Sequence, residues 1–556
     1  MRKLVSPSRV VGAALIVGLS FNQCTDKSIE TSNINSINES VYFNNVTELS
    51  EALTAVYAGL QRGGLYQASF QMIHGYASDE MTTTRSLEQY DRYIDGKQYL
   101  LHDYRPTGQS DANLSRSYWS DAYATIYRAN YFLQKVENYK STAADDKAVV
   151  DRMIGEAKFL RAFLYFNLAT DYGAVPLRTR TNDPGALGAT SQADVYKFVE
   201  TELLDAKQRL WDRTKLFADA GNIGRAQKAS ATALLGKMYL YQKRYAEAAA
   251  QFEEIVTPKN GEFQYALMPN FGDNFLENAE NNAESLFEVQ FQYGLNGTTN
   301  PGYVIDDSGA QWGAGHYNPE TNQFNGNLGP DGHGNFNARP SAALVAAFEK
   351  GDPRMDATVY GRNTRFVLSK VRKNGKDDPD YSPDNTFAVT FDRLKATVAQ
   401  DLGTPTDLNA GYAIAKWNTP DLTKFDNDEN SNLSGTGRGG INQRVIRYAD
   451  ILLMLAEAKL AGGKGPNGEA AKYINQVRAR ARSGKNVLPD VTGTFDDLVH
   501  ERQVELAYEQ VRRRDVIRWG LAPQLFKGFQ ASKHELFPYP EAEVNGNPDL
   551  KQNPKY

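Results

Sequence analysis

The residues of this chain that could take part in catalysis do not form any recognised catalytic pattern. The sequence has no G-x-S-x-G nucleophile elbow, no G-x-x-x-x-G-K-[ST] phosphate loop, no H-E-x-x-H pair and no G-x-G-x-x-G turn after a strand. Its 67 acidic residues supply many carboxylate pairs of the kind that glycosidases use, but such pairs are uninformative without geometry. We therefore expect a protein that catalyses no reaction and needs no cofactor.

Residues that could bind a metal are also scarce. Cys24 is the only cysteine and there are six histidines, which excludes an intramolecular disulfide and argues against a Cys/His zinc cluster. In the run DNDENSN, Asp426, Asp428 and Asn430 have the spacing of the first half of a calcium loop. The run lacks the glycine of the sixth position and has Gly437 at the twelfth, where calcium loops carry a bidentate glutamate. The sequence therefore predicts no metal site.

The position of Cys24 indicates a different role for its thiol. A basic start (residues 1–9) precedes a short apolar block (10–19), which has the length of a signal-peptide core and is too short to span a bilayer. The triplet Phe-Asn-Gln before Cys24 fits neither an ordinary signal peptidase site nor the Leu-small-small pattern of the usual lipobox. We predict a signal peptide over 1–23, lipidation of Cys24, and a polar, flexible tether over 24–45. The alternative is a free cysteine in an ordinary cleaved signal or leader.

The bulk composition excludes two broad classes of protein. A formal net charge of −5 and a pI near 5.9 argue against nucleic-acid binding, which needs a concentrated positive field. No segment after the leader is apolar for 18 residues or more, so no membrane-spanning helix is expected. The 31 tyrosines and 26 phenylalanines indicate either many half-exposed core edges or an aromatic binding surface in contact with water.

Helical periodicity identifies the elements that must position any binding residues. Long amphipathic or apolar stretches predict helices over 47–60, 118–137, 151–173, 191–210, 229–256, 445–460 and 468–481. In the fifth of these, Gly236 and Tyr239 are followed by Ala248 and Phe252, which matches the tetratricopeptide helix-turn-helix pattern. One such repeat cannot bury its apolar face alone, so we expect stacked helical repeats over about 118–256 and 445–520.

Residues 258–442 have a different character. They are rich in Gly, Asn, Asp, Pro and aromatic residues, with short strand-like runs at 285–293 and 364–372. Loops of this length are usually functional or disordered, and aromatic residues such as Trp312 and Phe324 argue against disorder. The predicted fold class is mainly all-α: a tetratricopeptide-repeat-like helical scaffold with a large, irregular, loop-rich insertion that carries a few short strands.

A charged stretch near the C-terminus, ERQVELAYEQVRRRDVIRWG (501–520), alternates acidic and basic residues at helical spacing. As one helix it predicts an internal salt-bridge lattice rather than a basic patch, with the members Glu501, Glu505, Glu509, Arg512, Asp515 and Arg518. The same stretch resembles the C-terminal signature of the SusD/RagB family of outer-membrane nutrient-binding lipoproteins, E-R-x-x-E-L-x-x-E-x-x-R-x-x-D-x-x-R-W-G. Residues 155–177, 447–460 and 536–556 are similar to further signatures of this family, so the resemblance runs along the whole chain.

The resemblance implies a single all-α domain over 46–556, held by its lipid anchor on the outer face of a Bacteroidetes-type outer membrane. It also implies a partner, a SusC-like TonB-dependent transporter, and a ligand, an oligosaccharide or polysaccharide that the chain captures and delivers. The RagB branch leaves an alternative open, in which the same fold captures peptides or another nutrient. Neither role involves catalysis or nucleic acid.

Glycan-binding residues in the family lie on an exposed face built by an early loop and by the insertion. Here the early loop covers 75–106, where D-x-Y-x-D-G at 91–96 is similar to a tryptophan-bearing family version, with tyrosine in its place. Flat aromatic side chains can stack on sugar rings while polar groups bond the hydroxyls. The candidate ligand-binding residues are Asp79, Arg85, Tyr90, Tyr93, Tyr99, Tyr303, Trp312 and Tyr317. Three of the five tryptophans are predicted to lie in the core instead: Trp119, Trp417 and Trp519.

Overall fold

The computed structural model describes residues 43–67, 69–82, 113–140, 143–258, 263–291, 339–360 and 441–556. It also describes Lys416 and the two-residue strands at 317–318, 323–324, 372–373, 376–377 and 413–414. The predicted fold class is confirmed, because this part of the chain is mainly helical with a few short strands. No helix within these ranges has the length and apolarity needed to cross a lipid bilayer.

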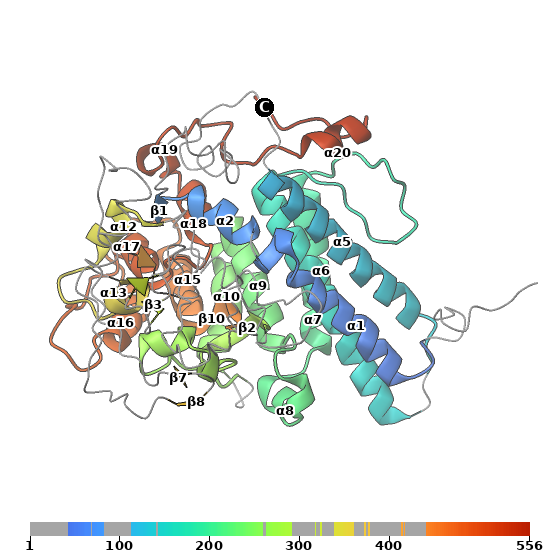
Figure 1. The fold of residues 1–556 in the computed structure, drawn as a ribbon, viewed down its shortest axis with the longest axis horizontal. Coiled ribbons are helices and arrows are strands. Elements are labelled where there is room, and N and C mark those ends of the chain that lie inside the picture. The colour runs from blue at the N-terminus through green and yellow to red at the C-terminus, as the bar shows by residue number, and fades with distance from the viewer. Residues whose placement is uncertain are drawn as a thin grey trace, which may run out of the picture.

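Stacked helices form the body of the molecule (Figure 1). The N-terminal series consists of α1 (Val46–Leu60), α2 (Ser69–Tyr76), α5 (Asn113–Val136), α6 (Ala144–Tyr172), α7 (Gln192–Arg209), α9 (Lys228–Tyr241) and α10 (Tyr245–Val256). The C-terminal series consists of α15 (Tyr448–Leu460), α16 (Gly468–Ala481) and α17 (Phe495–Glu505). Neighbours along the chain pack together from α5 through α6, α7, α9 and α10 to α15, and α15 packs on α16 and α17. The two predicted groups of repeats are therefore one continuous stack.

The hairpin of α9 and α10 shows why the repeat pattern has a small residue. A Cβ added to Gly236 on α9 would lie 2.6 Å from the Phe252 ring on α10, so only glycine allows the two helices to approach this closely. Helix α9 is buried from Ala229 to Leu240 because α6, α7, α10 and α15 all pack around it. The tetratricopeptide-like pairing predicted over 229–256 is confirmed.

A single cluster of buried apolar side chains extends from Leu49 in α1 to Leu550 near the C-terminus. The face of α1 that periodicity predicted contributes Leu49, Leu53, Val56 and Leu60, each at most 1% exposed. Side chains of α15 enter the same cluster from the C-terminal series. The N-terminal and C-terminal parts of the chain thus share one core.

The longest strands lie where the insertion meets the helical stack. β2 (Ser285–Val289) pairs antiparallel with β10 (Gln443–Arg447), and α15 follows β10 directly. The strand predicted over 285–293 is confirmed in its first part, whereas the helix predicted from 445 is wrong for 445–447, which belong to β10.

The other strand pairs are β1 (Met81–Thr82) with β5 (Arg339–Pro340), β3 (Tyr317–Asn318) with β4 (Gln323–Phe324), β6 (Val359–Tyr360) with β9 (Ala413–Ile414), and β7 (Arg372–Lys373) with β8 (Lys376–Asp377). Of the run predicted as a strand over 364–372, only Arg372 lies within the described residues.

Short helical segments connect these elements. Those in the described parts of the insertion are η5 (Phe271–Phe275), η6 (Glu277–Ala279), α12 (Ala342–Ala347) and α13 (Arg354–Thr358). The others are η3 (Gly63–Gln67), α8 (Arg213–Phe217), η4 (Ala220–Asn222), α18 (Arg512–Arg518), α19 (Ala522–Leu525) and α20 (Glu541–Gly546). The described parts of the insertion therefore contain short helical turns as well as the predicted short strands.

The charged stretch 501–520 is not one helix, and that prediction is wrong. Helix α17 ends at Glu505 and α18 begins at Arg512. Between them Tyr508 and Gln510 have φ angles of 62° and 59°, a region that residues other than glycine rarely adopt. Such a break must be stabilised by tertiary contacts. Some of these contacts come from residues beside the candidate site.

Candidate ligand-binding face

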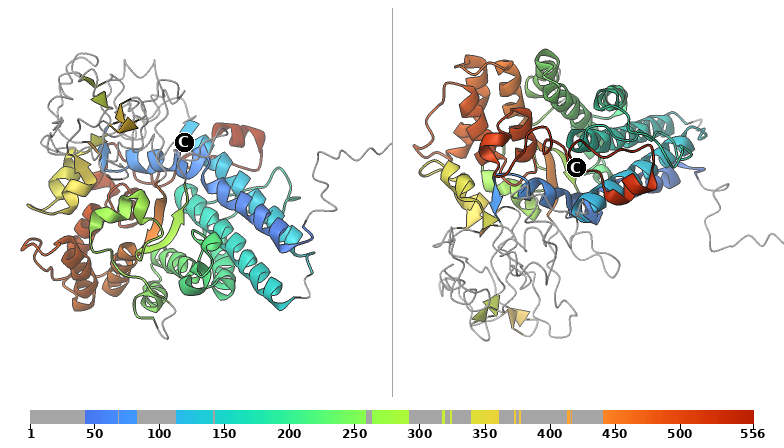
Figure 2. Two further views of the ribbon diagram at one scale, coloured as in Figure 1. Left: turned by 60° about the horizontal axis from the view of Figure 1, so that its bottom comes forward. Right: turned by 90° about the horizontal axis from the view of Figure 1, so that it is seen from above.

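One end of each of the two segments predicted to bind ligand joins the body at the same place. The β1–β5 pair sets Met81 opposite Pro340 and Thr82 opposite Arg339. The segment 83–112 therefore starts where the segment 292–338 ends. Beside this pair, the Ser341 hydroxyl donates a 2.5 Å hydrogen bond to the Asp79 carbonyl, and β1 lies next to α12 (Figures 1 and 2).

Two acidic residues before β1 tie this junction to the break between α17 and α18. Both carboxylate oxygens of Asp79 accept hydrogen bonds of 2.8 Å from Arg512. The neighbouring Glu80 is 2% exposed, and its Oε2 accepts a 3.3 Å hydrogen bond from the Tyr508 N–H. Burial, together with the negative charge of Asp79, raises the pKa of Glu80 to about 8, so this carboxyl is mostly protonated at neutral pH. The sequence analysis did not single out Glu80, and its only sequence signal is that it directly follows the candidate Asp79.

The candidate ligand residues can be followed only in part. Asp79 lies at the junction with its carboxylate already bonded to Arg512, and its side chain is 8% exposed. The backbone of Tyr317 is in β3, opposite Phe324 of β4. The other candidates lie outside the described residues: Arg85, Tyr90, Tyr93, Tyr99, Tyr303 and Trp312, together with the lipidation candidate Cys24 and the incomplete calcium loop at 426–432. Their assignments stay predictions.

The tryptophans predicted to lie in the core differ in burial. Trp119 is 2% exposed and packs edge-on against Tyr172 and Tyr539, which confirms its assignment. Trp519 is only half-buried, and its indole N–H donates a 2.9 Å hydrogen bond to Glu457. Trp417 lies outside the described residues.

The predicted salt-bridge lattice exists, but its pairs are long-range. Glu505 is fully buried and bonds three guanidinium groups: Arg447 at 2.6 Å, Arg354 at 3.0 Å, and Arg480. Burial alone would raise the pKa of Glu505, yet these three cations outweigh it and hold the pKa well below its usual range. Arg354 belongs to the insertion and Arg447 to β10, so Glu505 joins three separate parts of the chain.

A buried lysine from the insertion stabilises the break after α17. The Lys416 ammonium donates hydrogen bonds to the Glu505 and Ala507 carbonyls at 3.2 and 2.9 Å, and to the Glu509 carboxylate at 2.7 Å. It thereby satisfies carbonyls that the end of α17 leaves without helical partners. Burial lowers the pKa of Lys416 to about 8, against the opposing effect of Glu509.

The remaining charges of the C-terminal stretch hold the helices together in the same way. Asp515 bonds Arg502 and Arg518 at 2.7 and 2.8 Å, and Arg518 also pairs with Glu457 of α15 at 2.6 Å. Arg514 pairs with Asp171 at the end of α6. These charged groups are paired with one another, so we assign them to the scaffold rather than to a ligand site.

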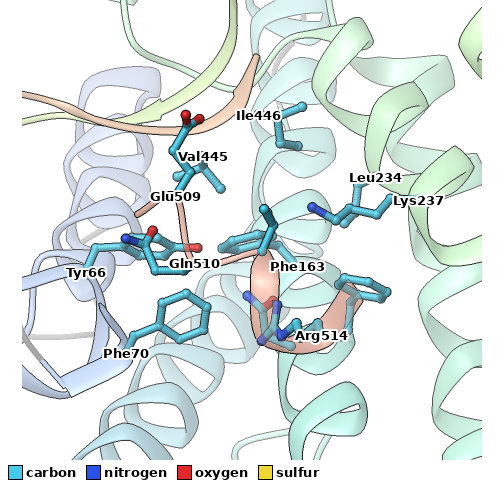
Figure 3. Close-up of a pocket in the computed structure, with 13 residues that line it drawn as sticks. Tyr66, Phe70, Phe163, Leu234, Lys237, Val445, Ile446, Glu509, Gln510 and Arg514 are labelled. Carbon is cyan, nitrogen blue, oxygen red and sulfur yellow. The ribbon is translucent and has the colours of Figure 1, made fainter. Parts of the chain in front are cut away.

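An internal cavity beside this network is too small for a sugar. Its volume is about 30 Å³, enough for about one or two water molecules. Figure 3 shows the aromatic rings of Phe70 and Phe163 around it, with the Lys237 amine directed towards the space. Three sides are core helices, so we do not assign it a ligand. Within the described ranges, no group of three or more His, Cys, Asp or Glu side chains is arranged to bind a metal ion.

Comparisons with known proteins agree with this architecture. A family model described as "SusD family" matches residues 278–535, and one described as "Starch-binding associating with outer membrane" matches residues 30–240. The chain is 25% identical over 543 residues to SusD-like protein P25 of Formosa agariphila, covering 92% of each chain. It is 22% identical over 486 residues to the starch-binding protein SusD of Bacteroides thetaiotaomicron, covering 78% of this chain and 76% of that one.

Solved structures show the same fold. A SusD superfamily protein from Bacteroides vulgatus superposes with a TM-score of 0.68 at 25% identity, covering 93% of this chain and all of that chain. A laminarin-binding SusD-like protein superposes with a TM-score of 0.69 at 26% identity, covering 92% of this chain and all of that one. Both matches run almost from end to end, so these proteins share the overall fold of this chain.

Proposed function

Because this chain belongs to the SusD/RagB family, we propose that it captures an oligosaccharide or polysaccharide and delivers it to a SusC-like TonB-dependent outer-membrane transporter. Proteins of the SusD family bind their ligands without catalysis, which confirms the sequence-based expectation that the chain is not an enzyme. The observation that carries the proposed site is the β1–β5 pair, which brings the residues just before the aromatic-rich segment 83–112 next to those just after the aromatic-rich segment 292–338.

The chemistry of these two segments suits a glycan. Sugars are strongly hydrated, so exchanging water for protein hydrogen bonds contributes little net free energy. Most of the driving force must come from apolar sugar faces covering aromatic rings, with polar groups fixing orientation. We propose that the rings are supplied by Tyr90, Tyr93, Tyr99, Tyr303, Trp312 and Tyr317, and the polar groups by Asp79 and Arg85. Asp79 fits the base of such a site because Arg512 already fixes its position and each carboxylate oxygen retains a lone pair.

The proposed location is the outer surface of the outer membrane. The family description "Starch-binding associating with outer membrane" supports it, as does the leader with its single cysteine. Acyl chains on Cys24 anchor the protein, residues 24–45 form the tether, and residues 46–556 form a single domain. The shared core from Leu49 to Leu550 supports one domain over this range.

The names of relatives suggest which glycans to test first. One similar solved structure is a laminarin-binding protein and one relative is a starch-binding protein, so laminarihexaose and maltohexaose are suitable probes. We expect Trp312→Ala to weaken binding of the preferred hexasaccharide at least tenfold, about 1.4 kcal/mol, in isothermal titration calorimetry. Tyr127→Ala removes an aromatic side chain that is 53% exposed on α5, and it should leave the affinity unchanged.

Three results would count against the proposal. Undiminished hexasaccharide binding by Trp312→Ala would remove Trp312 from the site. Binding of peptides but of no glycan would favour the peptide-capturing role of the RagB branch. Turnover of any glycan by the purified protein would show that it is an enzyme after all.

A further inference from the structure

A second pocket lies away from the junction of the two segments. Its volume is about 450 Å³, within the range of roughly 300–1,000 Å³ typical of small-molecule pockets. It is bounded by the start of α5, the loop after α6 and the C-terminal helix α20; we call it the α5–α20 pocket. Its lining includes Trp119, Ser120, Tyr123, Arg178, Glu543 and Asn547. Helix α20 and β1 are separated along the long axis of the molecule in every view (Figures 1 and 2).

The walls of the α5–α20 pocket are fixed by contacts of their own. The Trp119 ring packs edge-on against Tyr172 and Tyr539. The Tyr123 hydroxyl donates a 2.8 Å hydrogen bond to the Pro176 carbonyl, and the Asn547 amide donates one of 2.8 Å to the Leu187 carbonyl. The pocket is therefore formed before any ligand arrives, which lowers the entropic cost of binding.

Several polar groups that line the α5–α20 pocket could make further hydrogen bonds. Among the described residues, the Arg178 guanidinium donates only to the Pro184 and Gly185 carbonyls, which leaves three of its five N–H groups without a described acceptor. The Glu543 carboxylate makes no hydrogen bond or ion pair with any described residue, and neither does the Trp119 indole N–H. Arg178 and Glu543 thus line one pocket without pairing with each other.

This combination selects a class of ligand. An apolar ligand would displace water from Arg178 and Glu543 and would offer no hydrogen bonds in place of those lost. An anionic ligand would be repelled by the Glu543 carboxylate. A pyranose ring offers hydroxyls that accept from Arg178 and Trp119 and donate to Glu543, and it needs no net charge. We propose that the α5–α20 pocket binds one neutral pyranose ring, as a second carbohydrate site separate from the site proposed for segments 83–112 and 292–338. The lining residues named above all lie outside segments 83–112 and 292–338.

Saturation-transfer NMR of the full-length protein with D-glucose, D-galactose and D-mannose tests this assignment. The protein used carries Trp312→Ala, which weakens the site proposed for segments 83–112 and 292–338. A remaining monosaccharide signal then reports on the α5–α20 pocket, whether or not the first site exists. Ala542→Trp places a large ring at the mouth of the pocket, where Ala542 is exposed, and it should abolish the monosaccharide signal. Glu543→Gln keeps the shape but removes the charged acceptor, and it should weaken binding about tenfold.

Matched controls come from the exposed Glu541, which lies on the same helix but does not line the pocket. Glu541→Trp and Glu541→Gln should bind the monosaccharide as the parent does, and all variants should keep its thermal midpoint. Absence of a signal from all three sugars would overturn the assignment, as would a signal that Ala542→Trp leaves unchanged. Binding of glycine or a dipeptide in place of the sugars would also overturn it, in favour of a zwitterionic ligand.

Discussion

The substitution Glu505→Gln should destabilise the protein markedly, because it removes the charge at the centre of the buried network. Glu505 bonds Arg354, Arg447 and Arg480, and none of the four side chains is more than slightly exposed. Glutamine keeps one acceptor oxygen but removes one of the negative charges that these guanidinium groups share. Their other carboxylate partners are Asp352, Glu501, Glu284 and Glu509. Removing one partner of a buried pair typically costs about 3–5 kcal/mol.

The expected change in the midpoint of thermal unfolding depends on how many residues unfold together. Unfolding entropy near 60 °C is about 2.1 cal/mol/K per residue, or about 1.2 kcal/mol/K for a 556-residue chain that unfolds in one step. The expected loss then lowers the midpoint by about 3–4 °C, and by about twice that if only half of the chain unfolds cooperatively. Scanning calorimetry measures both the midpoint and the enthalpy, so it also tests whether 46–556 is one domain.

The pH dependence gives an independent check on Glu505. The pKa of this carboxyl is depressed in the folded protein, so its contribution is present at neutral pH and is lost as the pH falls below its unfolded value of about 4.5. The difference in midpoint between wild type and Glu505→Gln should therefore shrink as the pH is lowered from 7 towards 3. Glu247→Gln, which breaks an exposed pair with Arg244, should scarcely change the midpoint. An unchanged midpoint in Glu505→Gln at pH 7 would refute the view that this network holds the fold together.

Two further predictions concern the anchor and the repeat. Cys24→Ser should release the protein from the outer-membrane fraction and remove the mass of the acyl chains, and an unchanged fraction and mass would show that Cys24 is not the anchor. Gly236→Ala should cost about 1–3 kcal/mol because its Cβ would overlap the Phe252 ring, whereas Gly465→Ala, with no atom near its Cβ, should be neutral in thermal unfolding.

The spacing of apolar residues within short stretches of sequence was sufficient to predict most of the helical stack. Helix α16 begins at Gly468 and ends at Ala481, the same bounds that periodicity predicted, because one apolar stripe and the Asn467 cap define it within a few residues. Gly236 and Phe252 identified their hairpin because the repeat needs a small residue opposite a large one. These features depend on residues close together in the sequence.

The errors lie where distant residues decide the structure. Residues 445–447 belong to a strand because β2, far away in the sequence, pairs with them, and a short apolar run alone does not distinguish strand from helix. The break at Tyr508 has no glycine or proline to mark it; Lys416 and Glu80 stabilise it from other parts of the chain. The α5–α20 pocket likewise combines three separate segments, so no local motif could have indicated it.

The pairing of Asp79 with Arg512 also has a consequence for the order of events during synthesis. The two residues are 433 positions apart, and Asp171 and Arg514 are 343 apart. At translation rates of about 5–20 residues per second, Asp79 waits roughly 20–90 s before its partner exists. Contacts of such long range also make folding slow once the chain is complete. A nascent chain therefore cannot form these two ion pairs before α18 has been synthesised, and a product that terminates before α18 lacks both of them.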